Sequence, residues 1–542
     1  MSTRRFFLAA LLVAVLLVIP TGKVVAGSFE LTVLHTNDLH AHLAPFNEYG
    51  SLCTVQKDAE GQCQGGSARL AAAIAAERAG SPNVILLDAG DQFQGTLFYS
   101  RYKGQACAAL MNRLDYDAMT LGNHEFDDGP ETLAAFLKRL SFPALAANLD
   151  ATACPVLQGL FRPWILLDLN GRKVGVVGVT HPDIPRISSP GPLLTFADPV
   201  PEVVRAVAEL RKQGAGIIVC LSHLGLEGDR RLAAGVAGLD VIVGGHSHAL
   251  LANGDPEAEG PCPLVVRGRD GNPVLIVAAG YWGRYLGVLR VVFDDQGQIL
   301  TQRGNPRRMD AAAAQQGAVA AEVAHWGEGL LELQGQVIAE TRTALDVAAC
   351  RTGECLPGDL RAEAFLAGAA GQNATAALVN GGSMRNGLAP GPLTLGNMLA
   401  MYPFVDEVMA VTLTGADLRA ALEHGLSALG GHEGSGRFLQ VAGLRYTFDS
   451  SRPRGERLRD VWMFGPDGAA SPLDVQALYR IALPRFLYRG GDGFTVFAER
   501  GQDVFNDGKD LVEVMREFLQ RHSPLDRALD GRIRDLASDP NP

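Results

Sequence analysis

Short, β-branched apolar runs alternate with Ala-, Leu- and Arg-rich stretches between residue 29 and about residue 295. This alternation is typical of an α/β layered domain, in which helices cover strands. The runs that we expect to form strands are Leu31–His35, Val84–Leu87, Ala118–Leu121, Lys173–Val179, Ile217–Leu221 and Val241–Val243. The stretches that we expect to form helices include Ser67–Arg78, Glu131–Leu140 and Pro201–Gln213.

The pattern changes in the second half of the chain. Residues 274–294 predict a pair of strands around an aromatic, Gly-rich turn, and Ala311–Gln334 predicts a helix that bridges two domains. From about residue 336, helices and strands follow each other in a way that indicates an α+β domain. Its expected helices are Gly358–Ala369 and Gly415–Ala428, and its expected strands lie near Val408–Leu413, Leu444–Phe448 and Tyr479–Leu483.

The first 26 residues have the pattern of an export signal. Arg4 and Arg5 precede an apolar run from Phe6 to Ile19, and Ala26 supplies a small residue at the expected cleavage position. The alternative interpretation is a retained membrane anchor. We expect cleavage, a periplasmic or secreted protein, and no stable membrane anchor afterwards. The predicted organisation is a signal peptide at 1–26, a first domain at 27–310, a linker helix at 311–335 and a second domain at 336–542.

Composition narrows the classes of function. Of the 542 residues, 47% are apolar and 20% are charged, which provides for packed cores and excludes wholesale disorder. The formal net charge is −11, and a surface that acidic does not track the backbone of a nucleic-acid polymer. An anionic substrate therefore requires positive charge that is concentrated locally, by metal ions or by a few arginines.

The chain holds eight cysteines, and an exported protein can form disulfides. Two pairs are close in sequence and span polar, Gly-containing loops, so we expect the disulfides Cys53–Cys63 and Cys350–Cys355. Cys220 ends an apolar run and is expected to be a buried thiol. The pattern assigns no role to the remaining three, which are Cys107, Cys154 and Cys262.

Five of the apolar runs are followed at once by side chains that bind metals. The carboxyl ends of strands in an α/β sheet form one rim, so we expect these side chains to converge. They fit two divalent ions if one carboxylate is shared, and an imidazole-rich set without thiolates favours zinc, or a similar metal such as manganese or cobalt. The seven candidate ligands are Asp38, His40, Asp91, Asn123, His223, His246 and His248.

These residues lie in motifs that resemble a known family. NDLH (37–40), GDQ (90–92), GNHEFD (122–127), SHLG (222–225) and GGHSH (244–248) look like the ordered motifs of the calcineurin-like metallophosphoesterases. Downstream, NGGSMR (380–385), YPF (402–404) and FLYRGGDGF (486–494) resemble the C-terminal domain of the 5′-nucleotidases. The resemblance implies an α/β fold, a layered β-sandwich flanked by helices, followed by an α+β C-terminal domain for nucleotide recognition.

The same resemblance implies roles for individual residues. One metal ion would be held by Asp38, His40, Asp91 and His248, and the other by Asp91, Asn123, His223 and His246, with Asp91 shared. His124 and Asp127 match a catalytic dyad, whereas Glu125 between them is given no role. The residues that match contacts to the phosphate, base or ribose are Arg351, Asn380, Arg385, the stacking pair Phe404 and Phe486, and Asp492.

The leading hypothesis is an exported enzyme with two metal ions that hydrolyses nucleoside 5′-monophosphates, such as AMP, by metal-activated water. Its partner would be a nucleotide as small-molecule substrate, with no nucleic-acid polymer. Two alternatives use the same metal site: a 2′,3′-cyclic-nucleotide phosphodiesterase with 3′-nucleotidase activity, and a nucleotide-sugar or dinucleotide pyrophosphatase. A non-catalytic nucleotide-binding protein is disfavoured because no ligand position is lost.

Overall fold

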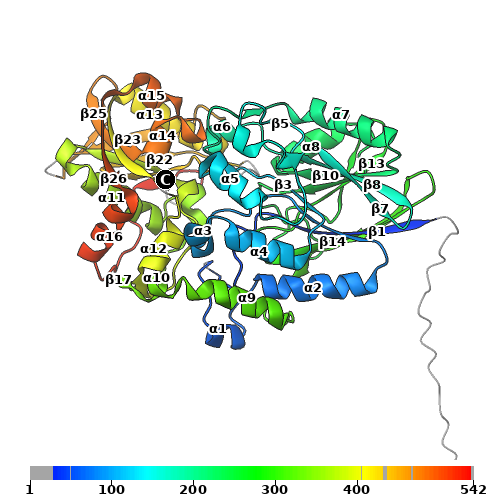
Figure 1. The fold of residues 1–542 in the computed structure, drawn as a ribbon. Helices are drawn as coiled ribbons and strands as arrows, with labels where there is room; N and C mark the ends of the chain where they lie inside the picture. The colour runs from blue at the N-terminus through cyan, green and yellow to red at the C-terminus, as the bar shows by residue number, and fades with distance from the viewer. Residues whose placement is uncertain (1–27, 49, 405, 431–435, 466–467, 539–542) are drawn as a thin grey trace, which may run out of the picture.

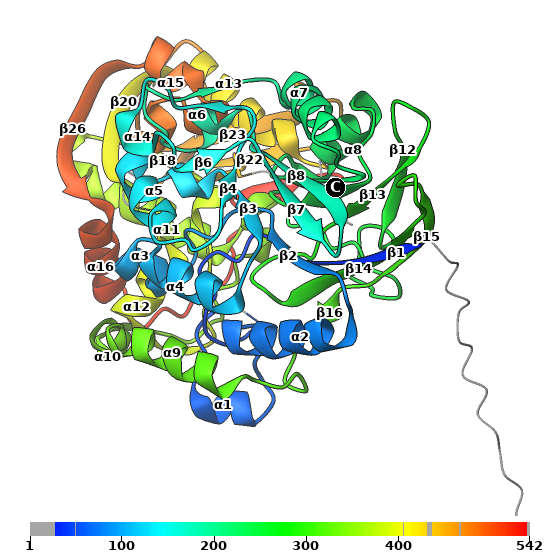
Figure 2. The same cartoon turned by 45° about the vertical axis from the view of Figure 1, so that its right-hand side comes forward.

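The computed structural model describes residues 28–48, 50–404, 406–430, 436–465 and 468–538. The predicted export signal at 1–26 lies outside them. Figures 1 and 2 show two lobes side by side, one drawn from blue to green and the other from yellow-green to red. In the described part of the chain, no helix combines the length and the apolar character needed to cross a membrane.

The first domain contains two large sheets packed face to face. One has the order β15 (Ile299–Gly304), β14 (Tyr285–Phe293), β1 (Phe29–Thr36), β2 (Val84–Asp88), β3 (Ala118–Thr120), β4 (Ala144–Leu145) and β6 (Phe161–Arg162), with β16 (Arg307–Arg308) beside β14. The other has the order β12 (Leu264–Arg267), β13 (Pro273–Val277), β11 (Val241–Gly244), β10 (Ile217–Ser222), β8 (Arg172–Val179) and β7 (Trp164–Leu169). Side chains such as Val33 and Ile85 of the first sheet share one core with Val176 and Val219 of the second.

Helices cover the outer faces of this sandwich. The first sheet packs on α2 (Ser67–Gly80), α4 (Gln105–Leu114) and α5 (Gly129–Leu137), and the second on α7 (Pro199–Lys212) and α8 (Gly225–Gly235). Short elements lie between them: α1 (Val55–Ala59), α3 (Leu97–Tyr102), η1 (His124–Phe126), α6 (Ile184–Ile187), and the paired strands β5 (Leu149–Asp150) and β9 (Thr195–Phe196). The layered β-sandwich flanked by helices is therefore confirmed.

The predicted helix over Ala311–Gln334 is present as two helices, α9 (Gly317–Glu328) and α10 (Leu331–Gly335). The break falls at Gly329, where a Cβ atom would lie 2.1 Å from the hydroxyl of Tyr102. That hydroxyl donates a hydrogen bond to the carbonyl of Trp326 at 2.7 Å. Helix α9 packs along α2 and α10 packs on the second domain, so the pair connects the two lobes (Figure 1).

The second domain is built on a sheet that is covered on both faces. The sheet has the order β21 (Leu439–Ala442), β18 (Ala376–Asn380), β25 (Leu478–Pro484), β20 (Glu407–Thr414) and β26 (Gln502–Asp510). One face carries α11 (Leu356–Gly368), α12 (Leu395–Met401) and α16 (Leu511–Arg521). The other carries α13 (Gly415–Gly425) and a smaller sheet of β24 (Ala470–Pro472), β23 (Leu458–Phe464), β22 (Leu444–Phe448) and β27 (Ile533–Asp535). Connecting elements are β17 (Val337–Thr341), η3 (Ala348–Arg351), β19 (Gly391–Thr394), α14 (Arg485–Tyr488), η7 (Gly491–Gly493) and α15 (Thr495–Arg500).

Apart from the helix expected over Ala311–Gln334, the predicted strands and helices are found within a few residues of their expected bounds. The predicted strand pair at 274–294 does not form a hairpin, because β13 pairs with β11 in one sheet and β14 pairs with β1 in the other. The five strand ends expected on the rim of one sheet likewise belong to two sheets: β1, β2 and β3 to the first, β10 and β11 to the second. Apolar runs predict strands, but they do not say which sheet a strand joins.

Candidate active site

The candidate ligands leave their strands in unusual backbone conformations. Asp38, His40, Asp91, His246 and His248 all have positive φ, between 46° and 74°. A non-glycine residue in this left-handed region costs on the order of 1–3 kcal/mol and persists where surrounding contacts over-determine it, as at functional sites. These five candidate ligands therefore lie at strained backbone positions of the kind found at functional sites.

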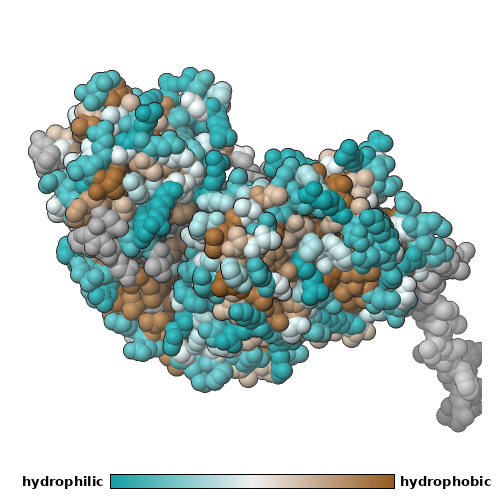
Figure 3. Space-filling view, turned by 45° about the horizontal axis from the view of Figure 1, so that its top comes forward, coloured by the Kyte–Doolittle hydropathy of each residue, from teal (hydrophilic) through white to brown (hydrophobic). Residues whose placement is uncertain are grey.

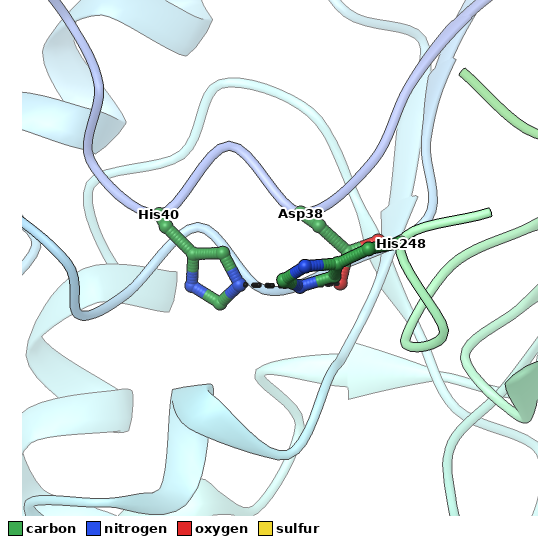
Figure 4. A group of neighbouring side chains, drawn as sticks. All are labelled: Asp38, His40 and His248. Atoms are coloured by element: carbon green, nitrogen blue, oxygen red, sulfur yellow. Dashed lines mark hydrogen bonds and ion pairs between the residues drawn. The ribbon is translucent and has the colours of Figure 1, made fainter. Parts of the chain in front are cut away.

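Three of these side chains form one group. The ligand atoms of Asp38, His40 and His248 all lie within 4.8 Å of one another. His40 Nε2 is 3.1 Å from His248 Nε2, and His248 Nε2 is 3.6 Å from Asp38 Oδ1. Figure 4 shows the two imidazoles pointing toward each other from separate loops, with the Asp38 carboxylate beside His248. Two imidazole nitrogens and a carboxylate oxygen aimed at one point suit a divalent transition metal.

A second group lies next to the first. Asp91, His223 and His246 bring their ligand atoms within 4.8 Å of one another, and Asp91 Oδ2 is 3.1 Å from His223 Nε2. The amide oxygen of Asn123 is 2.8 Å from His246 Nδ1 and 3.3 Å from His223 Nε2. Asp91 Oδ2 is also 3.9 Å from His40 Nε2, so this carboxylate lies between the two groups. The predicted ligand sets are thus brought together, with Asp91 in the shared position.

The electrostatics of the two groups suit cation binding. Burial lowers the pKa of His40, His246 and His248 well below the usual value, which favours the neutral imidazole, the form that has a lone pair for a metal ion. Burial alone would raise the pKa of Asp91, but the charges of His223, His124 and His40, together with the hydrogen bond to His223, outweigh it and hold the pKa well below its usual range. The same carboxylate overcomes the effect of burial on His223 and raises its pKa to about 10. A metal cation that took the place of the His223 proton would still give the Asp91 carboxylate a positive charge to pair with.

His124 lies beside the metal ligands with its ring held by a carboxylate. His124 Nδ1 is 2.6 Å from Asp127 Oδ2, and the backbone N–H of His124 donates to Asp91 Oδ1 at 2.9 Å. Burial lowers the pKa of His124, but the charges of Asp127 and Asp91 outweigh this and raise it. A protonated imidazole with Nδ1 engaged leaves Nε2 as a hydrogen-bond donor. His124 Nε2 lies 3.5 Å from Arg385 Nη1 of the second domain.

A cleft of about 1430 Å³ joins the two domains, and Figure 3 shows the surface hollowed between the lobes. From the first domain it is lined by Asp91, Asn123, His124, Asp127, His246 and His248, among others. All six predicted substrate residues also line it: Arg351, Asn380, Arg385, Phe404, Phe486 and Asp492. The remaining ligands Asp38, His40 and His223 are fully buried.

The second domain brings charge and aromatic surface to the metal ligands. Arg385 Nη2 lies 3.1 Å from His40 Nε2, which places a guanidinium directly at the first group. The ring of Phe404 lies 5.9 Å from that of His124, centroid to centroid. Phe486 rests against Gly491, where a Cβ atom would lie 2.6 Å from three of its ring carbons, so only glycine allows this seat. Asn380 Nδ2 donates to Asp492 Oδ2 at 2.7 Å and fixes the Asp492 carboxylate.

Both predicted disulfides are present. Cys53–Cys63 closes a loop of the first domain, and Cys350–Cys355 closes the loop that carries Arg351 at the edge of the cleft. The second loop is tied further by Gln440, whose Nε2 donates to the carbonyl of Cys350 at 2.9 Å. Cys220 is a buried free thiol, as expected, and the unassigned Cys107, Cys154 and Cys262 are buried free thiols as well.

Comparisons with known proteins identify the family. The model of the calcineurin-like phosphoesterases matches residues 31–250, and that of the 5′-nucleotidase C-terminal domain matches residues 335–499. The 5′-nucleotidase of Rattus norvegicus is 34% identical over 559 residues, which cover 99% of this chain and 95% of the rat protein. The chain belongs to the 5′-nucleotidase family.

Two further relatives of this family match over their full lengths. Snake venom 5′-nucleotidase of Naja atra is 35% identical, and the alignment covers 94% of this chain and 99% of the Naja atra protein. The crystal structure of a 5′-nucleotidase precursor from Thermus thermophilus superposes with a TM-score of 0.87 at 39% identity, covering 94% of this chain and 100% of the other. Membership of the 5′-nucleotidase family makes this chain a metal-dependent phosphoester hydrolase with a dimetal site.

One residue inside a 5′-nucleotidase motif was given no role by the sequence. Glu125 is fully buried, and its carboxylate accepts hydrogen bonds from the backbone N–H groups of Asp91, Gln92 and Gly122 at 2.6–2.9 Å. It therefore fixes the loop that carries Asp91, the candidate for the shared ligand. No local pattern distinguishes such a carboxylate from a solvated one, because its partners on that loop lie more than 30 positions away in the chain.

Proposed function

We propose that this protein is an exported 5′-nucleotidase that hydrolyses nucleoside 5′-monophosphates, such as AMP, to a nucleoside and inorganic phosphate. The observation that carries the proposal is the position of Arg385, a residue of the second domain, whose Nη2 lies 3.1 Å from Nε2 of His40 in the first domain. A phosphate that contacts the metal ligands of the first domain would meet this guanidinium of the second. The aromatic rings of Phe404 and Phe486 line the same cleft, within reach of the rest of a nucleotide.

The two groups of ligands fit two divalent ions, and we propose zinc, with manganese or cobalt as alternatives. Asp38, His40, Asp91 and His248 would hold one ion, and Asp91, Asn123, His223 and His246 the other. The set is rich in imidazole and has no thiolate, which suits these metals better than magnesium. Two such ions, when bound, supply an activated water and neutralise charge on both sides of an in-line displacement at phosphorus.

The chain's own residues would position the phosphate and help the leaving group. Arg385 presents a planar guanidinium that can pair two phosphate oxygens. His124 presents Nε2–H to the cleft and would donate to the oxygen that leaves with the nucleoside. Asp127 keeps Nδ1 of that ring engaged at 2.6 Å, which fixes both the tautomer and the orientation of the imidazole.

Recognition of the nucleoside would come from the second domain. Phe404 and Phe486 would stack on the base, which tolerates different bases because each presents a π-face. Asp492, held by Asn380, would accept hydrogen bonds from ribose hydroxyls, since a carboxylate accepts without donating. Arg351 would contact the substrate at the cleft edge, on the loop closed by Cys350–Cys355.

Two features support export to the periplasm or the cell exterior, with loss of the signal peptide at 1–26. The N-terminal pattern of basic residues, apolar run and small residue is that of a cleaved signal. Both disulfides are of a kind that persists in oxidising compartments.

A panel of phosphate esters tests the proposed reaction. Phosphate release from 5′-AMP should exceed that from 3′-AMP, 2′,3′-cyclic AMP and a nucleotide sugar at equal concentration. Chelation should abolish it, and zinc, manganese or cobalt should restore it, because the ligand sets lie at the reacting phosphate. Faster turnover of the cyclic nucleotide or the nucleotide sugar would assign the protein to that reaction instead.

Replacing either aromatic ring should affect nucleotides selectively. Phe404→Ala and Phe486→Ala should each lower kcat/KM for AMP by about 10- to 100-fold, the rate equivalent of the stacking energy of one base. Hydrolysis of p-nitrophenyl phosphate should change far less, because the metals and Arg385 contact the phosphate alone. Steady-state kinetics on the two substrates give the comparison.

Phe505→Ala provides the matched control, since Phe505 is an exposed phenylalanine of the same domain outside the cleft. It should leave both activities unchanged. Equal losses on AMP and p-nitrophenyl phosphate in the Phe404 and Phe486 variants would mean that these rings support the fold and do not stack on the base.

A further inference from the structure

Ser188 lies outside every motif considered so far, yet it contacts the dyad of His124 and Asp127. It follows α6 on a segment of the first domain, residues 185–192, that forms one wall of the cleft. Its hydroxyl donates a hydrogen bond to Asp127 Oδ1 at 2.7 Å. The other carboxylate oxygen, Asp127 Oδ2, is the one at 2.6 Å from His124 Nδ1. The three side chains form a continuous chain that ends at the cleft.

Engaging both oxygens fixes the rotation of the Asp127 carboxylate about its terminal bond. Ser188 and His124 are the side chains that hydrogen-bond to it within the described residues. The adjacent Asp128 is held separately by Tyr99 and Lys103, each at 2.8 Å, so the backbone here is anchored without Ser188. Loss of the Ser188 hydroxyl would therefore leave the Asp127 carboxylate held by His124 alone, while the loop stays in place.

We propose that Ser188 is a positioning residue for hydrolysis, acting through Asp127 to hold the imidazole of His124 toward the leaving oxygen. This inference rests on the proposed function of the His124 dyad. Outer hydrogen-bond partners of this kind fix the orientation of the group that acts on the substrate. The hydrogen bonds of Ser188 go to Asp127 and to the backbone carbonyl of Ile184.

The position of Ser188 also connects the dyad with the second domain. Helix α6, which ends at Ile187, packs against η7, the turn that carries Asp492. The segment that positions His124 thus contacts the turn proposed to bind the ribose. A substrate that holds η7 in contact with α6 would also hold Ser188 in position to donate its hydrogen bond to Asp127.

The test is Ser188→Ala, measured on AMP. We expect kcat to fall about 10- to 100-fold, as for other outer partners of a reacting group, with KM within about twofold and both metal ions retained. Ser188→Thr keeps the hydroxyl and should restore most of the activity. The matched control is Ser450→Ala, which removes a similar serine-to-aspartate hydrogen bond (Ser450 Oγ to Asp535 Oδ2, 2.5 Å) outside the cleft and should leave kcat unchanged.

A double variant decides whether Ser188 acts through Asp127. In an Asp127→Ala background, Ser188→Ala should cause no further loss of kcat, because its partner is already gone. The proposal would be overturned if the losses of kcat from the two single variants multiplied in the double variant. A rise in KM at unchanged kcat in Ser188→Ala, or loss of metal from it, would overturn the proposal as well. If the wild-type protein fails to hydrolyse AMP, the proposed function fails, and the same series on whichever ester of the panel it does hydrolyse still tests the link between Ser188 and Asp127.

Discussion

Asp91→Ala should release both metal ions and lower turnover of AMP by at least about 10⁴-fold. Asp91 lies between the two groups of ligands, with Oδ2 3.1 Å from His223 Nε2 and 3.9 Å from His40 Nε2. No other carboxylate of the described residues belongs to the second group, so the variant leaves only imidazoles and an amide there. Metal analysis of the purified variant, together with phosphate release, measures both effects.

Asp88→Asn is the matched control for this prediction. Asp88 is a buried carboxylate three positions before Asp91, held by the hydroxyl of Thr36 at 2.6 Å and the amide of Gln92 at 2.9 Å. It does not belong to either group of ligands, and burial raises its pKa to about 7, so an amide of the same shape is a mild change there. It should keep two ions per chain, whereas an Asp91→Ala protein that retains one ion would show that the groups do not share this carboxylate.

The convergence of the candidate ligands was predictable because these residues follow their strands immediately. Apolar runs reveal strands, and the carboxyl ends of strands meet at one edge, so residues such as Asp38 and His223 had to converge. The strands belong to two sheets and not to one, but the candidate ligands still converge, because the sandwich brings the ends of β3 and β10 to the same edge. A residue one or two positions beyond a strand has little freedom to be elsewhere.

Residues that act through distant partners were not predictable in the same way. Glu125 binds backbone N–H groups of the Asp91 loop, and Ser188 binds Asp127 from a segment 61 positions further along the chain. Neither contact follows from periodicity or from the chemistry of the side chain, since a glutamate or a serine in a loop is usually solvated. Such roles depend on tertiary placement, which only the structure gives.

The contact between the domains is a further example. Arg385 was expected to contact phosphate, but its approach to His40 and His124 depends on how the second domain is set against the first. The sequence places Arg385 after β18, at the edge of its own sheet. It gives no measure of the angle between lobes that are joined through α9 and α10.

His124→Ala should lower turnover of AMP by about 10²–10⁴-fold, the usual contribution of a positioned proton-transfer group, and leave both ions bound. The loss arises because the 5′-oxygen of the departing nucleoside no longer receives a proton as its bond to phosphorus breaks. The proposed ligand sets do not include His124: its Nδ1 is engaged by Asp127, although a ring nitrogen of His124 lies within 4.8 Å of ligand atoms of His40 and Asp91. Asp127→Ala should also lower turnover, because the imidazole of His124 would no longer be held in its orientation.

His248→Ala supplies the contrast that makes this prediction specific. The rings of His124 and His248 both pack edge-on against His40, with centroids 5.1 and 5.2 Å away, so the two variants remove similar volumes beside the same imidazole. His248 Nε2 lies 3.6 Å from Asp38 Oδ1 in the first group of ligands, and its loss should release one ion and the activity with it. Because proton donation matters most for a poor leaving group, the defect of His124→Ala should shrink on p-nitrophenyl phosphate, whereas that of His248→Ala should persist. Loss of an ion from His124→Ala, or equal defects on both substrates, would make His124 a ligand of the metal instead of a proton donor.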